Sequence, residues 1–239
     1  MNNSIVPRKI PAEKLEQAAR EYAAAGFYMI PLRPREKMPL IKTGRGHMDG
    51  ATRDPKVVMQ WHRRWPTMDL GLVTGAGSGI VVVDRDGPEG AASMARLEQE
   101  YGPLPETPTV RTSRGEHKYY SHPGGRIKTS AGVVAPGIDV RGDGGLVAAP
   151  PSIHKTGFVY EWDCLFDLSI PFAPLPGWLV ELTREKERPQ TVANEAPEGE
   201  TIGEGARNTA LTALAGSLRR TGLGGEDLVA ALMAINAER

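Results

Sequence analysis

Apolar positions in the first hundred residues change between helical and strand spacing. Residues 11–25 place apolar side chains on one face of a helix, with proline in the first turn and glycine at the end. Shorter apolar runs bounded by Gly, Pro and Asp are typical of strands. The predicted helices cover residues 11–25, 54–66 and 88–101, and the predicted strands cover 27–32, 70–73 and 80–83.

After Pro108 the pattern consists mainly of strands and turns. Strands are predicted over residues 109–112, 118–121, 138–140, 146–149 and 159–162, and a short helix over 177–183. An α/β half followed by a mainly antiparallel half predicts an α/β (α+β) protein. We expect an N-terminal α/β unit and an antiparallel sheet unit to form two modules around one cleft.

The C-terminal part of the chain has a different composition. Residues 184–203 are polar and almost free of large apolar side chains, which is typical of a linker. Amphipathic helices are predicted over 205–219 and 226–237. We therefore expect one large domain over 1–185, a linker over 186–203 and a small helical segment over 204–239. The pattern is still helical at Arg239, as in a chain cut within a helical domain.

Composition narrows the class of protein. The 239 residues are 40% hydrophobic and carry a formal net charge of zero, which argues against a purely electrostatic nucleic-acid binder. The single cysteine, Cys164, excludes an intramolecular disulfide and a cysteine-based zinc cluster. Without an apolar run of about 18 residues or an apolar leader, we expect no membrane association and a cytoplasmic protein.

Two aspartates follow the buried strand predicted at residues 80–83. The sequence there is Ile-Val-Val-Val, followed by Asp84-Arg85-Asp86-Gly87. Side chains alternate along a strand, so Asp84 and Asp86 point to the same side, about 6–7 Å apart. Their like charges repel, and a divalent cation with oxygen ligands would hold them together. The alternative is a turn or helix cap, in which Asp-x-Asp-Gly only ends the strand.

A basic turn joins the strands predicted at 109–112 and 118–121. Its Arg111, Ser113 and Arg114 offer cations and polar groups beside Gly115, and backbone amides in such a turn suit a phosphate. His117 follows at the start of the second strand, where we expect it at the rim of a cleft. The alternative for His117 is a structural histidine.

Polar side chains also mark the later strands. Asp139 lies between Ile138 and Val140 in a predicted strand, so its carboxylate opposes theirs and needs a partner. Asp143 lies in a glycine-rich turn and is interpreted as a turn residue. Arg141 and, after Pro150-Pro151, Ser152 and His154 add further polar groups.

The order of these motifs resembles the bifunctional primase-polymerase domain of the archaeo-eukaryotic primase superfamily, found in plasmid and phage replication proteins. The resemblance covers about residues 15–180 and includes Ala-Thr-Arg-Asp-Pro at 51–55 and Pro-Pro-Ser-Ile-His at 150–154. The tail beginning Gly-Glu-Gly-Ala-Arg-Asn-Thr at 203 resembles the helical primase C-terminal domain. One departure is Glu116 directly before His117, where many relatives have Gly-Gly-x-His. The chain contains no P-loop motif for helicase chemistry.

The resemblance implies that the antiparallel sheet unit is similar to an RNA-recognition motif and that residues 1–185 form a primase-polymerase catalytic domain. It also implies a role for each candidate residue. Asp84, Asp86 and Asp139 match metal ligands, and His117 matches a histidine that contacts the phosphates of the nucleotide. The remaining residues expected to bind nucleotide are Arg111, Ser113, Arg114, Arg141, Ser152 and His154.

The expected reaction is template-directed nucleotidyl transfer. Two divalent ions, Mg²⁺ or Mn²⁺, would activate a primer 3′-hydroxyl and neutralise the triphosphate. Expected partners are a single-stranded DNA template, a primer, NTP or dNTP substrates and a helicase domain or protein. Residues 108–157 hold seven Lys or Arg against three acidic residues, which suits these anions. The alternatives are a metal-dependent nuclease and a non-catalytic single-strand-binding or regulatory module.

Overall fold

The computed structural model describes residues 9–44, 46–163 and 171–183. All of them belong to one unit, Met1–Lys186, and a second unit comprises Glu187–Arg239. The predicted linker and the two predicted C-terminal helices lie outside the described residues. Within the described ranges, no helix is long and apolar enough to cross a membrane.

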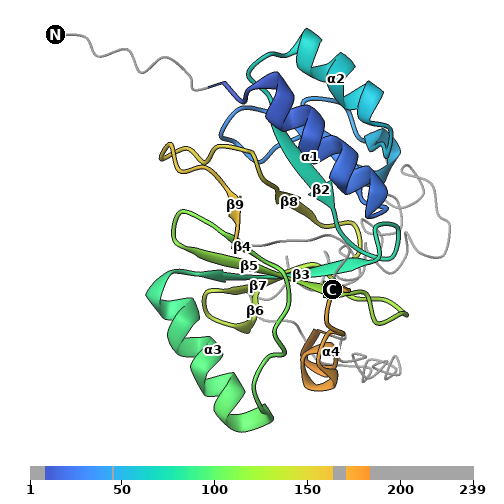
Figure 1. The fold of residues 1–239 in the computed structure, drawn as a ribbon. Helices are drawn as coiled ribbons and strands as arrows, with labels where there is room; N and C mark the ends of the chain where they lie inside the picture. Colours follow the sequence, from blue (N-terminus) through green and yellow to red (C-terminus); the bar gives the residue numbers. More distant parts are fainter. Residues whose placement is uncertain (1–8, 45, 164–170, 184–239) are drawn as a thin grey trace, which may run out of the picture. The chain divides into compact units, whose positions relative to one another are not determined.

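Two helices pack together against the first sheet (Figure 1). Helix α1 (Ala12–Ala24) contacts helix α2 (Pro55–Arg64), and both contact strand β1 (Tyr28–Leu32). Helix α2 begins as predicted at Asp54, whose carboxylate accepts a hydrogen bond from the Lys56 N–H at 2.8 Å. These helices cover an antiparallel sheet in the order β1, β2 (Asp69–Val73), β8 (Leu146–Ala148).

The second sheet has six strands, and all its pairs are antiparallel. In spatial order its strands are β6 (Ser130–Ala135), β7 (Ile138–Arg141), β3 (Ile80–Asp86), β5 (Gly115–Ser121), β4 (Thr109–Arg111) and β9 (Glu161–Trp162). The remaining elements are the short 3₁₀ helix η1 (His47–Gly50), α3 (Gly87–Tyr101) and α4 (Gly177–Thr183).

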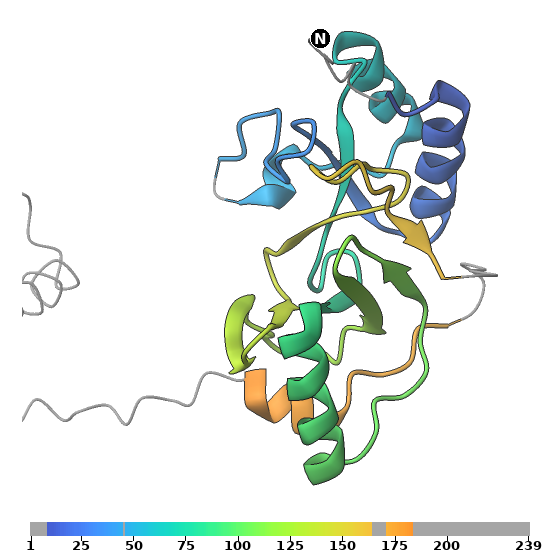
Figure 2. The ribbon, with the colours of Figure 1, turned by 90° about the vertical axis from the view of Figure 1, so that its left-hand side faces the viewer.

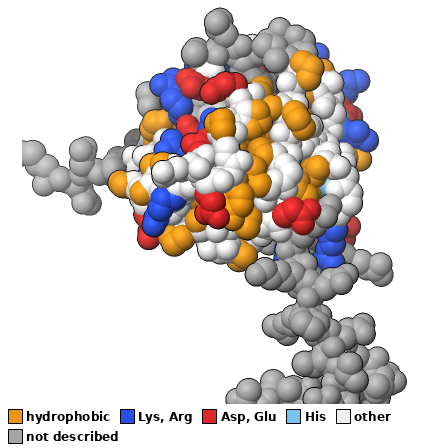
Figure 3. All heavy atoms as spheres, turned by 90° about the horizontal axis from the view of Figure 1, so that it is seen from below, with side chains coloured by type: hydrophobic (Ala, Val, Ile, Leu, Met, Phe, Trp, Pro, Cys, Tyr) orange, Lys and Arg blue, Asp and Glu red, His pale blue; other side chains and the backbone are white. Residues whose placement is uncertain are grey.

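The two faces of the second sheet belong to different cores. Ile80 and Val82 of β3 point into the core shared with the first sheet, while Val81 and Val83 belong to a core with Met94 of α3 and residues of α4. Figure 2 shows α3 and α4 together on one side of this sheet. Seen from that side, apolar side chains lie among charged ones, with Lys and Arg mainly toward the edges (Figure 3). Asp84 and Asp86 alternate in step with Ile80 and Val82 along β3, so they lie on the other face, toward the first sheet.

The α+β fold class is confirmed, but the predicted division near Pro108 is wrong. Strand β3 and helix α3, which the sequence pattern assigns to the first half, form the centre and the cover of the second sheet. Strand β8, from the later half, returns to pair with β2 of the first sheet. Strand β6 was not predicted, because its sequence SAGVVA shows no alternation of apolar and polar residues. In the structure the strand is largely exposed.

Asp143 is a turn residue, as its glycine-rich surroundings predict. One carboxylate oxygen accepts the Ala76 N–H at 2.9 Å and the other accepts the Ile127 N–H at 2.8 Å. The Nε2 atom of His122 lies 3.3 Å from the first oxygen. Asp143 therefore connects three loops that are distant in sequence.

Candidate active site

Three of the predicted site residues form a row across the second sheet. Asp84 on the central strand β3 lies opposite His117 of β5 on one side and opposite Asp139 of β7 on the other. Residues that pair in register across antiparallel strands point to the same face. The sheet thus brings together three motifs that are separated by 33 and 22 residues in sequence.

Asp84 and His117 contact each other beneath the surface. The His117 Nε2 atom lies 3.6 Å from Asp84 Oδ2, and the two side chains are 2% and 15% exposed, respectively. Burial alone would raise the pKa of Asp84, but the hydrogen bond and charge of His117, with help from Lys37 and Arg141, lower it below its usual range. Asp84 is therefore held as a carboxylate.

The predicted position of His117 at the rim of a cleft is wrong. The residue is 1% exposed, and its ring centroid lies 5.8 Å from that of Tyr160. Its Nδ1 atom is buried and has no hydrogen-bond partner among the described residues. His117 pairs in register with Val110, which belongs to the core shared with the first sheet, so β5 directs the imidazole inward.

Asp86 lies two residues beyond Asp84 on the same face, at the end of β3. It occupies the N-cap position of α3, yet its side chain makes no capping hydrogen bond within the described structure. Its Oδ2 atom instead pairs with Nη2 of Arg114, which extends from the turn between β4 and β5. The helix-cap alternative for the Asp-x-Asp motif is thus correct for the backbone position and not for the carboxylate.

Asp139 also has an arginine partner. Its Oδ2 atom accepts a hydrogen bond from Arg141 Nη2 at 2.7 Å, and its Oδ1 atom accepts one from the Gly132 N–H at 2.9 Å. Ile138 and Val140 on either side are fully buried in the opposite core, as the alternation predicts. The partner that a carboxylate at this position requires is supplied here by a guanidinium.

The donor chemistry of this face fits a divalent cation. Asp84, Asp86 and Asp139 provide hard oxygen ligands, which Mg²⁺ and Mn²⁺ prefer. However, among the residues that the structure describes, no three or more acidic, His or Cys side chains are clustered closely enough to hold an ion. Arg114 and Arg141 neutralise two of the three carboxylates, so ion binding requires these arginines to move away.

The backbone amides predicted to hold phosphate are already used. The Thr112 hydroxyl accepts hydrogen bonds from the N–H groups of Gly115 at 3.0 Å and Arg114 at 3.4 Å. This local bonding shapes the turn that carries Ser113, which is half-buried. Arg114 extends from the turn to Asp86, one of the three carboxylates, Asp84, Asp86 and Asp139, that we call the acidic row. These two amides are therefore not free for an anion, and the Arg114 side chain is the cation that the turn presents.

Arg111 lies on the wrong face for the predicted contact with nucleotide. It pairs in register with Glu116, and Glu116 follows the strand alternation away from the face of Asp84. The Arg111 guanidinium approaches Glu161 at 3.6 Å and Asp163 at 4.0 Å. Strand alternation, which the predicted turn hid, explains this correction.

Ser152 has a structural position, contrary to the predicted contact with nucleotide. It is buried, its hydroxyl donates to the Leu70 carbonyl at 2.8 Å, and the same oxygen accepts the Leu70 N–H at 2.8 Å. Both hydrogen bonds attach the segment after Pro151 to the start of β2. A hydroxyl used in this way is not free to bind a ligand.

His154, two residues further on, is half-buried, and its ring centroid lies 6.2 Å from that of Tyr160. Burial lowers the pKa of His154, and the positive charges of Lys37, Lys155 and Arg114 lower it further, while Asp86 acts in the opposite direction. The imidazole of His154 is therefore influenced by charged side chains of both signs, and its contact with nucleotide stays a prediction.

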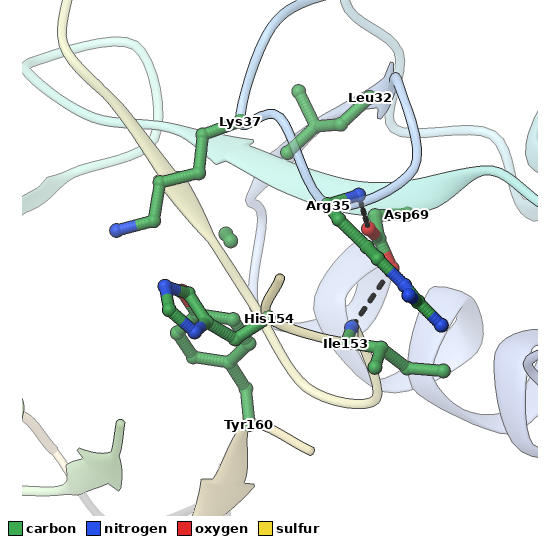
Figure 4. Close-up of a pocket in the computed structure, with 8 residues that line it drawn as sticks. Leu32, Arg35, Lys37, Asp69, Ile153, His154 and Tyr160 are labelled. Carbon is green, nitrogen blue, oxygen red and sulfur yellow. Dashed lines mark hydrogen bonds between the residues drawn. The ribbon is translucent and has the colours of Figure 1, made fainter. Parts of the chain in front are cut away.

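Three residues of this region were missed in the sequence. Tyr160 is buried, with its ring between His117 and His154, whose centroids lie 5.8 Å and 6.2 Å away. Lys37 Nζ lies 5.9 Å from the centre of the Tyr160 ring. Lys37, Tyr160 and Asp69 line a small pocket, to which His154 also contributes (Figure 4). No local pattern in the sequence distinguishes these residues. Lys37, for example, lies in a loop with several other basic residues.

The fold and the acidic row define an α+β protein of the primase-polymerase class. The family of bifunctional DNA primase/polymerase N-terminal domains matches residues 19–178, and the chain belongs to this family. The family implies nucleotidyl transfer with DNA and nucleotides as substrates, and its enzymes generally depend on divalent metals. Comparison with curated proteins found none that matches this chain.

Proposed function

We propose that this protein carries out template-directed nucleotidyl transfer on single-stranded DNA, as primase and polymerase, in plasmid or phage replication. The observation that carries the proposal is the row of His117, Asp84 and Asp139 on adjacent strands, with Asp86 two residues along the same face. The substrates would be a template, a primer and NTP or dNTP, and the setting would be the cytoplasm. A helicase domain or protein would open the duplex.

Asp84, Asp86 and Asp139 would hold two divalent ions, Mg²⁺ or Mn²⁺. When bound, the ions would activate the primer 3′-hydroxyl and neutralise the triphosphate. Asp84 is the best prepared of the three, because its lowered pKa keeps it ionised and its main partner is an imidazole. Asp86 and Asp139 would first have to release their arginines.

Arg114 and Arg141 would then serve the nucleotide. Each guanidinium contacts a proposed metal ligand, so each lies beside the position where the triphosphate must bind. A guanidinium binds phosphate oxygens through two parallel hydrogen bonds, and such charge-assisted bonds are about twice as strong as neutral ones. We assign both arginines to the phosphates and remove Arg111 and Ser152 from that role.

The main role of His117 would be to position Asp84 and keep it ionised. Its Nε2 atom faces the carboxylate, and its buried ring supports the position and the charge of that group. A contact with the phosphates, which the resemblance implies, requires the ring to become accessible from its present 1% exposure. We therefore propose His117 as a positioning residue whose effect on the nucleotide passes through Asp84.

Two alternatives share parts of this site. A nuclease could use the same carboxylates, whereas a single-strand-binding module would need none of them. The cations facing the acidic row favour a triphosphate, because they are placed beside the carboxylates rather than along an extended strand. Three acidic residues on one face would also oppose DNA binding once their arginines moved away, unless a cation were bound.

A single assay separates these functions. The protein is incubated with a single-stranded template, labelled nucleotides and Mg²⁺ or Mn²⁺, with and without primer, beside an Asp84→Asn control. Extension that depends on Asp84 supports the proposal, and product without primer identifies primase activity. Shortening of the template without extension would establish a nuclease, and DNA binding with neither reaction would establish a binding module.

A further inference from the structure

The loop between Arg33 and Met38 has a backbone that ordinary residues rarely adopt. The loop is closed by the Arg33 N–H donating to the Met38 carbonyl at 2.7 Å. Arg35 has φ 64° and Lys37 has φ 55°, and they are the only non-glycine residues with positive φ among those the structure describes. Lysine and arginine have no intrinsic preference for this region, so the surrounding structure must impose it.

A buried carboxylate holds this loop in place. Asp69 at the start of β2 is 5% exposed, and its Oδ2 atom accepts the Arg35 N–H at 2.7 Å. Its Oδ1 atom accepts the Ile153 N–H at 2.8 Å, as the dashed lines in Figure 4 show. One side chain therefore connects the loop that carries Lys37 to the segment that carries His154.

The Lys37 side chain extends from this loop toward the acidic row. Figure 4 shows its amine on the same side of the pocket as the His154 imidazole. Its Nζ atom lies 5.9 Å from the Tyr160 ring, which also contacts His117, the register partner of Asp84. Lys37 is exposed and forms no ion pair within the described part of the chain.

These observations indicate an anion-binding amine. A lysine without a carboxylate partner gains nothing from a strained backbone unless its position is used. Its charge acts on Asp84, His154 and the region between them, and lowers the pKa of both groups. In a nucleotidyltransferase the anion beside the metal-binding carboxylates is the triphosphate of the incoming nucleotide.

We propose that Lys37 binds the triphosphate of the incoming nucleotide and that the buried Asp69 positions Lys37 together with His154. The inference rests on the proposed function and adds a substrate-binding residue and a positioning residue to it. A template strand could also attract an exposed amine, but an amine held beside the ion-binding carboxylates is better placed for a short, highly charged triphosphate.

The test removes the charge without changing the backbone preference. Asparagine tolerates the left-handed region, so Lys37→Asn keeps the loop conformation and eliminates the amine, whereas Lys37→Arg retains a cation. Lys42→Asn is the matched control, because Lys42 is another exposed lysine in the same connection between β1 and η1. Primer extension gives KM and kcat for dNTP, and separate titrations give affinity for single-stranded DNA.

We expect Lys37→Asn to raise KM for dNTP by about 10- to 150-fold, the range for a lost hydrogen bond between charged groups. The kcat, DNA affinity and inhibition by a nucleoside monophosphate should change little. Lys37→Arg should restore most of the KM, and Lys42→Asn should behave as the wild type. An unchanged KM in Lys37→Asn, or a loss of DNA affinity in its place, would overturn the assignment.

The positioning role of Asp69 is tested by a double variant. Asp69→Asn retains the shape but replaces one acceptor with a donor, so one of the two loops should be released. KM should rise, and adding Lys37→Asn to Asp69→Asn should raise it much less than Lys37→Asn does alone. A general loss of structure would lower kcat as well and would leave the two effects on KM multiplicative, which would overturn the role of Asp69.

The same experiment distinguishes failure of this inference from failure of the proposed function. A wild type that extends primers, with an inactive Asp84→Asn variant and an unaffected Lys37→Asn variant, defeats only the role of Lys37. A wild type that neither extends primers nor binds dNTP defeats both.

Discussion

Asp84 and Asp139 lie directly opposite each other on the neighbouring antiparallel strands β3 and β7. Two carboxylates in register on one face repel unless cations lie near them. Here Arg141 contacts Asp139, while His117 and Lys37 lower the pKa of Asp84. This part of the sheet therefore holds negative charge at a fixed place, which the proposed binding of divalent ions would require.

The first prediction concerns these two carboxylates. We expect Asp84→Asn and Asp139→Asn each to reduce kcat of primer extension by at least about 10²–10³-fold, comparable to removing one group that stabilises charge in a transition state. Thermal unfolding should change little, because each substitution also removes a repelling charge. Asp163→Asn is the control, since Asp163 contacts Arg111 on the other face. Retained extension in Asp84→Asn would refute the proposed role of the acidic row.

The second prediction concerns competition between arginine and metal. Removing the guanidinium in Arg141→Ala frees Asp139, so the affinity for Mn²⁺ without nucleotide should increase. KM for dNTP should rise by about tenfold or more in the same variant, because a charge-assisted contact with phosphate is lost. Titration with Mn²⁺ and steady-state extension measure the two effects.

Arg111→Ala is the matched control for that experiment. Arg111 is exposed and pairs with Glu161 and Asp163 away from the acidic row. Neither Mn²⁺ affinity nor KM should change in this variant. Equal effects of Arg111→Ala and Arg141→Ala would mean that overall charge, and not position, governs both quantities.

The third prediction concerns His117. Because the side chain is 2% exposed, His117→Ala should lower the free energy of unfolding by about 2 kcal/mol or more. His117→Gln can place an N–H near the position of Nε2 and should restore part of the activity, while a purely structural histidine would show recovery of stability only. Nucleotide binding and thermal unfolding should be measured on the same samples.

The fourth prediction is a dependence of stability on pH at Asp143, which is not one of the proposed metal ligands. Burial would raise the pKa of Asp143, but two backbone N–H groups and His122 outweigh it and lower the pKa below 3.8. A lowered pKa stabilises the folded state above pH 3.8, and this stabilisation is lost as pH falls through the folded-state pKa. The stability difference between wild type and Asp143→Asn should therefore shrink in acid. A difference that stays constant from pH 7 to about pH 2 would contradict it.

The fifth prediction concerns the C-terminal unit, Glu187–Arg239. Ending the chain after Glu185 should spare extension of an existing primer, because the acidic row and its arginines all lie before that residue. Synthesis without a primer should be reduced if the C-terminal unit helps to hold the template and the first nucleotide. Loss of simple primer extension would show that the catalytic unit needs the C-terminal residues.

The sequence by itself determined the features that depend on local periodicity. The alternation of side chains along a strand puts Asp84 and Asp86 on one face and sets Asp139 opposite Ile138 and Val140. Proline and aspartate at helix starts marked α2 correctly. The order of the motifs was sufficient to predict the family, which the match over residues 19–178 confirms.

Only the tertiary structure decided which of the candidates meet. Register between antiparallel strands placed Asp84 between His117 and Asp139, and the same register turned Arg111 to the opposite face. Such pairings join residues tens of positions apart, so no local window contains them.

The same reason explains the residues that were missed. Asp69 meets Arg35 and the N–H of Ile153, which is 84 residues away in sequence. The left-handed backbone at Lys37 has no signature in a sequence of ordinary basic residues, because it is imposed by the contacts around the loop. The identity of the residues determines which chemistry is available, and the folded contacts determine which of them share a site.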